Sequence, residues 1–312
     1  ALTLPVVQTK IAHYVTERLN EKYKIDIQID QIAITSFADV KLKRVLIKDH
    51  HKDTLIYANR ITTNILDLNK MTSGDLVFRS IRLNRLLVNM KTYKGETDTN
   101  LDKFISSFDD GKPSSKKFLL TANTVYLEES HFMLTDENRK VPKDVDFTKL
   151  NARVSDFKIH GPDVTTSIEK MSFQDHRGLY VKNLQSKFTY TKKHILLNEL
   201  DVITNHSLFK GDVSLNYKRE DFQDFNNKVR FNITIDQASL STNDIRYFYK
   251  EMGKDQNFTL KAHITGTLND LVARKMNLTD SKNTQIIGNV NFKNLFGTDD
   301  QPFYMKGDFT KV

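Results

Sequence analysis

The feature that most constrains the fold of this chain is a strict alternation of apolar and polar residues over long stretches. Residues 229–235 and 258–268 carry an apolar residue or glycine at every second position, with polar residues between them. Successive side chains of a strand point to opposite faces of a sheet, so each stretch predicts a strand with one apolar and one polar face. The same alternation is present in residues 209–217, 286–292 and 303–309, and less regularly in 184–190. The chain is therefore predicted to be mainly β.

Helical patterns are few, and the longest one is at the beginning of the chain. Apolar residues recur at steps of three and four in residues 3–23, which predicts an amphipathic helix over residues 1–24. Its apolar stripe consists of Leu4, Val7, Ile11, Val15 and Leu19. We expect this stripe to lie against the mouth of the sheet or against a membrane surface, the alternative being a helix that packs on its own domain.

Two short inserted helices are predicted within the series of strands. The first covers residues 100–108 and has Thr99 as its N-cap; the second covers residues 244–252, between Asn243 as N-cap and Gly253 as stop. Residues 25–312 are otherwise expected to form one repetitive β domain, with a possible linker at 111–117.

An imperfect repeat indicates how the sheet grows. Residues 200–217 align with residues 276–292, and both read as a short strand, a polar turn and an alternating strand in which Gly is followed by Asp or Asn and then Val. A recurring hairpin predicts a sheet extended by repetition, although two ordinary hairpins that look alike remain the alternative. Gly211, Gly266, Gly288 and Gly307 fall on the apolar faces, where they either let the sheet curl or mark simple bulges.

Composition excludes several classes of protein. The 312 residues contain no Cys, which excludes disulfides and thiolate metal sites. No apolar run approaches the roughly 20 residues that span a bilayer. The net charge of +8 is spread along the chain without a nucleic-acid-binding motif, so no nucleic-acid partner is expected.

Catalytic motifs are also missing from the sequence, and we expect neither an enzyme nor a cofactor. The best candidate for a metal site is residues 49–53, where two imidazoles and two carboxylates lie within five residues. Adjacent His residues on a strand point to opposite faces, and a turn leaves both hydrated. The sequence therefore favours a solvated turn over a metal site.

The apolar faces lead to a hypothesis about function. About three helical segments cannot cover the roughly twenty strands that the pattern suggests, so the sheet either closes on itself as a compact sandwich or leaves an open apolar groove. We favour an elongated, curled, antiparallel-rich sheet with an apolar interior, because it explains the alternation without a helix layer. Such a groove suits phospholipid acyl chains, which gain about 0.8 kcal/mol for each CH₂ removed from water. The residues expected to line it are Phe188, Phe209, Val213, Leu215, Tyr217, Val229, Phe231, Ile233, Ile235, Phe258, Leu260, Ile264, Ile286, Val290, Phe292, Phe303, Met305 and Phe309.

Several segments resemble a known family. The opening residues 4–12, the strand pattern of 23–34, the segment 40–49 and the recurring Gly-Asp-Val-type strands are similar to the N-terminal part of TamB proteins, which belong to the wider AsmA-like group. The composition is rich in Lys and Asn, and in this respect the chain resembles a Bacteroidetes version of the family. The resemblance covers most of the chain and rests on pattern, without a catalytic motif.

The resemblance implies a location and partners. Proteins of this family are anchored in the inner membrane by an N-terminal transmembrane helix, cross the periplasm as a curled sheet with an apolar groove, and meet a BamA-like or TamA-like outer-membrane barrel through their C-terminal end. Neither the anchor nor the barrel-binding region is recognisable here, so we expect a membrane-proximal portion of a longer chain. The resulting hypothesis is a non-enzymatic phospholipid conduit between the two membranes, and the alternative is a translocation and assembly scaffold for outer-membrane proteins.

Overall fold

The computed structural model describes residues 13, 16–17, 20–21, 23–34, 39–65, 75–107, 117–139, 143–295 and 300–311. These residues form mainly β structure, and the fifteen strands follow one another in the sheet in the same order as in the sequence. This arrangement confirms the predicted mainly β class and the antiparallel-rich sheet, and it gives fifteen strands where the sequence suggested roughly twenty. The six strands predicted from alternation are all present.

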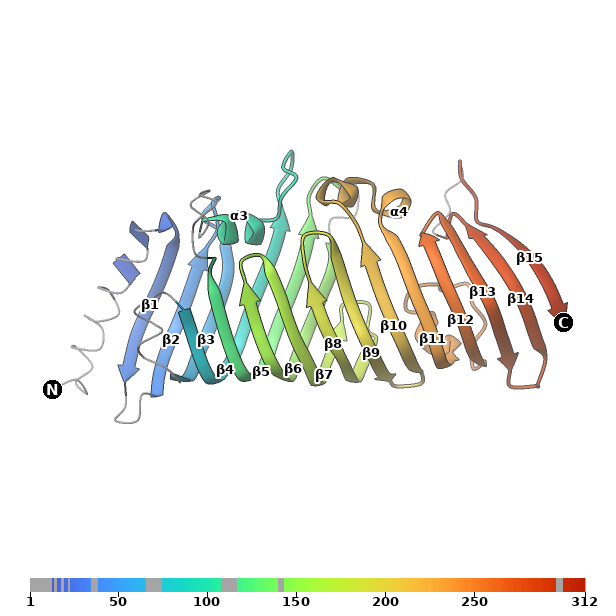
Figure 1. The fold of residues 1–312 in the computed structure, drawn as a ribbon, viewed down its shortest axis with the longest axis horizontal. Helices are drawn as coiled ribbons and strands as arrows, with labels where there is room; N and C mark the ends of the chain where they lie inside the picture. Colours follow the sequence, from blue (N-terminus) through green and yellow to red (C-terminus); the bar gives the residue numbers. More distant parts are fainter. Residues whose placement is uncertain are drawn as a thin grey trace. The chain divides into compact units, whose positions relative to one another are not determined.

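Contacts divide the chain into two compact units, Ala1–His176 (unit 1) and Arg177–Val312 (unit 2). Figure 1 shows the strands of each unit side by side in chain order. The strands of unit 1 are β1 (Asp26–Ile34), β2 (Asp39–Lys48), β3 (Thr54–Ile65), β4 (Asp75–Thr92), β5 (Leu119–Asp136), β6 (Lys143–His160) and β7 (Asp163–Asp175). The strands of unit 2 are β8 (Tyr180–Tyr190), β9 (His194–Thr204), β10 (Leu208–Asn216), β11 (Arg230–Ser241), β12 (Asn257–Thr267), β13 (Asp270–Asp280), β14 (Gln285–Lys293) and β15 (Tyr304–Lys311).

One pair of strands in unit 1 is parallel. β4 and β5 run in the same direction, whereas the other pairings that join neighbouring strands within unit 1 are antiparallel. A parallel pair needs a crossover connection of a dozen or more residues, and the chain between β4 and β5 contains α3 (Asn100–Ser106). α3 begins at the predicted N-cap, since Thr99 accepts a hydrogen bond from the backbone N–H of Asp102 and the Asp102 side chain accepts one in return.

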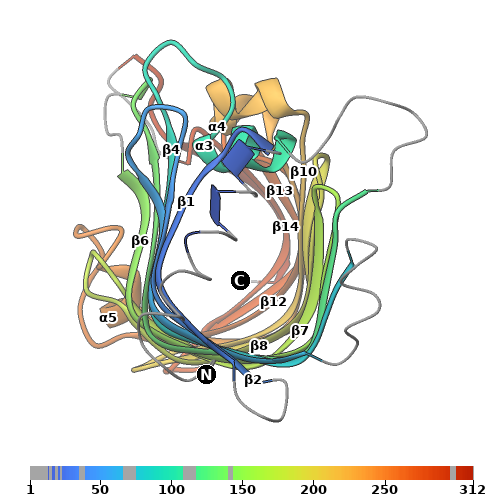
Figure 2. The same ribbon diagram turned by 90° about the vertical axis from the view of Figure 1, so that its left-hand side faces the viewer.

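The strands bend along their length (Figure 2), and charged residues mark the bends. Within the described strands, seven charged residues have a positive φ of 47–53°: Arg44, Arg85, Glu129, Lys149, Asp156, Glu199 and Lys275. All seven side chains are exposed. Each left-handed residue shifts the alternation of its strand by one position and increases the local bend. The register with a neighbouring strand shifts as well at five of them, which are Glu129, Lys149, Asp156, Glu199 and Lys275.

The repeat in the sequence is explained by these bulges. The backbone N–H of Glu199 donates to Asp212 Oδ1 at 2.8 Å, and the N–H of Lys275 donates to Asn289 Oδ1 at 3.0 Å. The Asp or Asn of each repeat thus satisfies the free N–H of the bulge on the preceding strand. The Gly before it is required by close approach, because a Cβ at Gly211 would overlap the carbonyl oxygen of Thr234 on the next strand.

The second inserted helix is shorter than predicted. α5 covers Thr242–Ile245 and is capped by Ser241, whose side chain accepts from the backbone N–H of Asn243. The prediction of residues 244–252 with Asn243 as cap was therefore wrong. The helix stops early because the Arg246 guanidinium donates to the carbonyls of Lys250 and Met252, which holds the following residues in turns.

Two further helical segments were not predicted. They are η1 (Arg219–Asp224) and α4 (Phe225–Lys228), which connect β10 to β11. At the N-terminus, residues 13, 16–17, 20–21 and 23 of the predicted helix 1–24 are helical, and Lys24 lies in a turn. The stripe residues Leu4, Val7, Ile11, Val15 and Leu19 lie outside the described residues, as do residues 111–116 of the expected linker.

Candidate functional site

The apolar residues of unit 2 form continuous rows across its strands. Residues directly opposite one another in neighbouring strands lie on the same face of a sheet, so the register defines each row. One row crosses all eight strands through Phe188, Leu197, Val213, Ile233, Ile264, Ala273, Val290 and Gly307. A second row contains Tyr190, Ile195, Leu215, Phe231, Gly266, Leu271, Phe292 and Met305.

A third row and two shorter ones complete this face, which we call the apolar face of unit 2. The third row contains Leu184, Val202, Phe209, Ala238, Leu260, Leu278 and Ile286. One shorter row contains Leu200, Gly211, Ile235 and Ala262, and the other contains Met276, Gly288 and Phe309. Phe258 lies opposite Leu240, and it shares the apolar face with Leu260, which is two residues further along β12.

Burial varies across the apolar face. A cluster of buried residues lies at its centre, including Ile235, Met276 and Val290. Around this cluster the side chains are half-buried, among them Val213, Ile233 and Ile264. A face sandwiched against a second layer is expected to be buried throughout. The half-buried rows instead leave apolar surface accessible at the described positions.

One end of the apolar face is covered. Tyr217 and Val229 are 6% and 0% exposed, and η1 and α4 lie over this end. The ring of Phe222 lies 4.6 Å from that of Tyr217, and the ring of Phe225 lies 6.0 Å from that of Phe231. Tyr217 and Val229 are thus packed beneath a helical cover and do not line open surface, in contrast to their predicted role.

The side chains at β15 are much more exposed. Phe303, Met305 and Phe309 are 51%, 53% and 41% exposed, and Phe303 stacks on Phe292 with ring centroids 6.5 Å apart. β15 is an end strand in the sheet order and pairs with β14. Its apolar residues therefore continue the rows of the apolar face into the last described strand.

Unit 1 carries an equivalent face that the sequence analysis missed. One row crosses its seven strands through Ile32, Leu42, Ile61, Leu83, Leu127, Ala152 and Met171. A parallel row contains Ile34, Val40, Thr63, Ile81, Val125, Val154 and Ile168. The sequence does carry a signal for this face. Apolar residues alternate with polar ones along these strands, but the apolar positions move by one at each charged residue that has a positive φ.

The opposite faces of both units are polar. Charged side chains pair across neighbouring strands, as in Lys210 Nζ with Asp201 Oδ2 at 3.0 Å and Arg153 Nε with Glu169 Oε2 at 2.7 Å. Asp270 on this face pairs with Lys293, and that hydrogen bond lowers the pKa of Asp270. Such pairs keep one face in water, which confines apolar ligands to the other.

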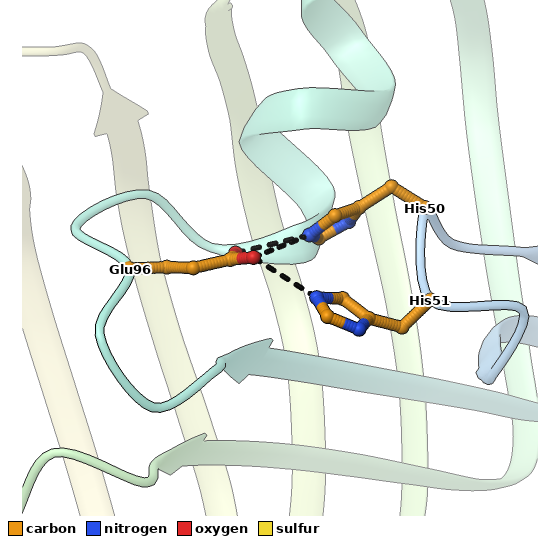
Figure 3. Close-up of side chains that lie close together, drawn as sticks. All are labelled: His50, His51 and Glu96. Carbon is orange, nitrogen blue, oxygen red and sulfur yellow. Dashed lines mark hydrogen bonds and ion pairs between the residues drawn. The ribbon is translucent and has the colours of Figure 1, made fainter.

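The turn between β2 and β3 contains the residues considered as metal ligands. His50 and His51 lie in a turn, as the sequence predicted, and Asp49 at its start is buried. Burial raises the pKa of Asp49, but hydrogen bonds from Asn100 and Tyr93 outweigh it, so the pKa lies below its ordinary value. The two imidazoles converge on Glu96 (Figure 3), a residue that the sequence analysis did not connect to them.

A polar cleft lies at the beginning of unit 1. It has a volume of about 570 Å³ between the first helical residues and β1, and its described lining includes His13, Glu17, Asp30 and Arg44. Polar walls make it unsuited to acyl chains. In the part of the chain that the structure describes, no helix has the length and hydropathy of a membrane-spanning segment.

The fold and these faces define a class of protein: a sequentially ordered, curled β-sheet whose apolar face is covered only in part. No protein-family model matches the chain, and the search of curated proteins found no match.

Proposed function

We propose that this chain is a non-enzymatic conduit for phospholipid acyl chains. The observation that supports the proposal is the row through Phe188, Val213, Ile233 and Ile264, which crosses every strand of unit 2 and is half-buried at these positions. From β8 to β12 this row offers an acyl chain similar contacts at each successive strand, whereas its members Ala273 and Val290 on β13 and β14 are each 1% exposed. Because such contacts are non-directional, movement from one strand to the next has a low barrier.

The polar face complements this role. A lipid bound to the apolar face keeps its tail out of water, at about 0.8 kcal/mol for each CH₂, while its headgroup stays hydrated. Binding and sliding need no bond-making or bond-breaking. Conduction therefore requires no catalytic residue in this chain.

The proposal includes a location and partners. The resemblance to TamB proteins supports a place in the periplasm, with attachment to the inner membrane through an upstream helix and contact with a BamA-like or TamA-like barrel through a C-terminal region. In that setting the apolar face carries phospholipids between the inner and outer membranes and supports outer-membrane biogenesis.

Site-specific photo-crosslinking tests the proposal. A photoreactive amino acid at Val213 or Ile264 is expected to form phospholipid adducts in cells that make the protein. The matched control is Lys261, which is exposed and belongs to the same strand as Ile264 but to the opposite face. Equal adduct yields at Lys261 and Ile264 would contradict the conduit.

A second candidate function is a scaffold for the translocation and assembly of outer-membrane proteins. The edge strand of an open sheet presents free N–H and C=O groups to which another strand can add. In this role the chain pairs with strands of outer-membrane proteins during assembly. Crosslinks from Met305 to protein and none from Val213 to lipid would support the scaffold over the conduit.

A further inference from the structure

The β2–β3 turn of unit 1 holds its two histidines in a fixed geometry. Asp49 Oδ1 accepts the backbone N–H groups of His51 at 2.9 Å and Asp53 at 3.0 Å, which locks the turn. Asp49 Oδ2 accepts the Tyr93 hydroxyl at 2.7 Å. The Tyr93 ring in turn lies against the ring of His51, with centroids 3.8 Å apart. The same buried carboxylate therefore orients the backbone and one of the two imidazoles.

The loop that carries Glu96, the residue whose carboxylate the histidines share, is held by hydrogen bonds to its backbone. The backbone N–H of Glu96 donates to the carbonyl of Tyr93 at 2.9 Å, and its carbonyl accepts Asn138 Nδ2 at 3.0 Å. His50 Nε2 lies 2.9 Å from Glu96 Oε2, and His51 Nε2 lies 2.9 Å from Glu96 Oε1 (Figure 3). Two separate loops thus bring three donor atoms to one point.

These three side chains match the ligand set of a divalent transition metal. Two imidazole nitrogens and one carboxylate oxygen are the three protein ligands of many zinc sites, with the fourth position left to water. The donor atoms all lie within 4.8 Å of one another. Ligands at about 2.0–2.1 Å around a tetrahedral ion are about 3.3 Å apart. Small side-chain movements therefore suffice to admit an ion.

A cation already occupies part of this space. Lys103 on α3 places its Nζ 2.8 Å from Glu96 Oε2 and 3.2 Å from His50 Nε2. Partial burial raises the pKa of Glu96, but hydrogen bonds from His51, Lys103 and His50 bring it down to about 2. The Lys103 side chain is 37% exposed, and its flexible stem lets it move into water.

We propose that His50, His51 and Glu96 bind one Zn²⁺ ion and that Lys103 competes with the ion for the same position. Bound metal connects the β2–β3 turn to the loop after β4, beside α3. It thereby fixes the end of unit 1 at which these loops meet. This site is independent of the proposed lipid conduit.

Zinc titration of the purified, untagged 312-residue chain by calorimetry tests the site. We expect one equivalent of Zn²⁺ to bind the unmodified chain. His51→Ala and Glu96→Gln should each weaken the affinity at least about tenfold, since each removes a ligand. Lys103→Met should strengthen it several-fold, because it removes the competing ammonium while keeping a side chain of similar length.

The matched control is His263→Gln, which removes a histidine that bonds to Asn232 in unit 2. It should bind zinc as the unmodified chain does. Circular dichroism of each variant establishes that it is folded, and the rise in Tm with added Zn²⁺ gives a second measure of affinity. Unchanged affinity in folded His51→Ala, or weaker binding in Lys103→Met, would overturn the proposal in favour of a plain ion-pair cluster.

Discussion

Left-handed charged residues are the smallest feature that shapes this sheet. The bulges at Glu199 and Lys275 place the residue that follows each of them, Leu200 and Met276, on the apolar face, where it is buried. An L-residue in this conformation is strained by roughly 1–2 kcal/mol, and Gly is not. The charged side chain points into water, so the strained position stays solvated while its neighbour is buried.

The first prediction concerns this strain at Lys275. We expect Lys275→Gly to raise the free energy of unfolding by about 0.5 kcal/mol, because relief of strain exceeds the extra entropy of the unfolded chain. Lys275→Val should lower it by about 1–2 kcal/mol, since β-branched residues tolerate a positive φ poorly. Lys261→Gly, at a strand position without a positive φ, should destabilise by about 0.5–1 kcal/mol. Urea denaturation measures all three, and destabilisation by Lys275→Gly equal to that by Lys261→Gly would contradict the role of the bulge.

The second prediction concerns the acceptor that satisfies the bulge. Asn289→Ala leaves the N–H of Lys275 without its side-chain partner and should cost about 1 kcal/mol of stability. Asn289→Asp keeps an acceptor oxygen at the same place and should cost less. Thermal unfolding monitored by circular dichroism compares the two variants. Equal losses would show that the hydrogen bond does not matter.

At the scale of elements, a buried carboxylate fastens α5 to the β9–β10 turn. Asp244 is 5% exposed and accepts hydrogen bonds from the Thr204 hydroxyl and from the backbone N–H of His206. Burial raises the pKa of Asp244, but the hydrogen bonds from this turn, that of Thr204 foremost, lower it below its ordinary value. A lowered pKa in the folded state means that the ionised carboxylate stabilises the fold.

The third prediction follows from this lowered pKa of Asp244 in the folded state. Asp244→Asn should cost about 2 kcal/mol at pH 7, because hydrogen bonds to a charged acceptor are lost. The unmodified chain loses the same contribution as the pH falls below the unfolded pKa of about 3.9 and through the lower folded pKa. The difference between the two proteins should therefore shrink below about pH 4. Urea titrations at several pH values measure it, with exposed Asp236→Asn as control; a difference that is constant down to pH 3 would refute the assignment.

The elements also show how far the sequence alone could be interpreted. Uninterrupted alternation predicted β11 and β12 correctly, because a half-buried strand has a simple period. Alternation failed in residues 40–49, where the apolar positions change from even to odd numbers at the left-handed Arg44, and this change hid the apolar face of unit 1. The cluster of His50, His51 and Glu96 could not be predicted from the sequence for another reason. Glu96 lies 45 residues from His51, and their contact depends on the pairing of β3 with β4.

At the scale of the whole molecule, the order of the strands determines which parts depend on one another. Each strand pairs with its neighbours in the sequence, so the contacts that build the apolar face of unit 2 come from residues close in the chain. Its buried centre contains Ile235, Ala238, Ala262, Ala273, Met276 and Val290, all within Arg177–Val312. In sheets of this kind, stability is close to a sum of terms from adjacent strands.

The last prediction is that residues 177–312 fold without the rest of the chain. Their eight strands supply both the hydrogen bonds and the apolar cluster that the unit needs, and three or more strands with a shared apolar face suffice for independent stability. We expect β-type circular dichroism and a single cooperative urea transition. The Ala273→Asp variant should abolish that transition, because it buries an unpaired carboxylate at a position that is 1% exposed. The polar-face variant Lys275→Asp, two residues along the same strand, should leave the transition in place. A fragment without a cooperative transition would mean that the apolar face of unit 2 forms only when the strands of unit 1 precede it.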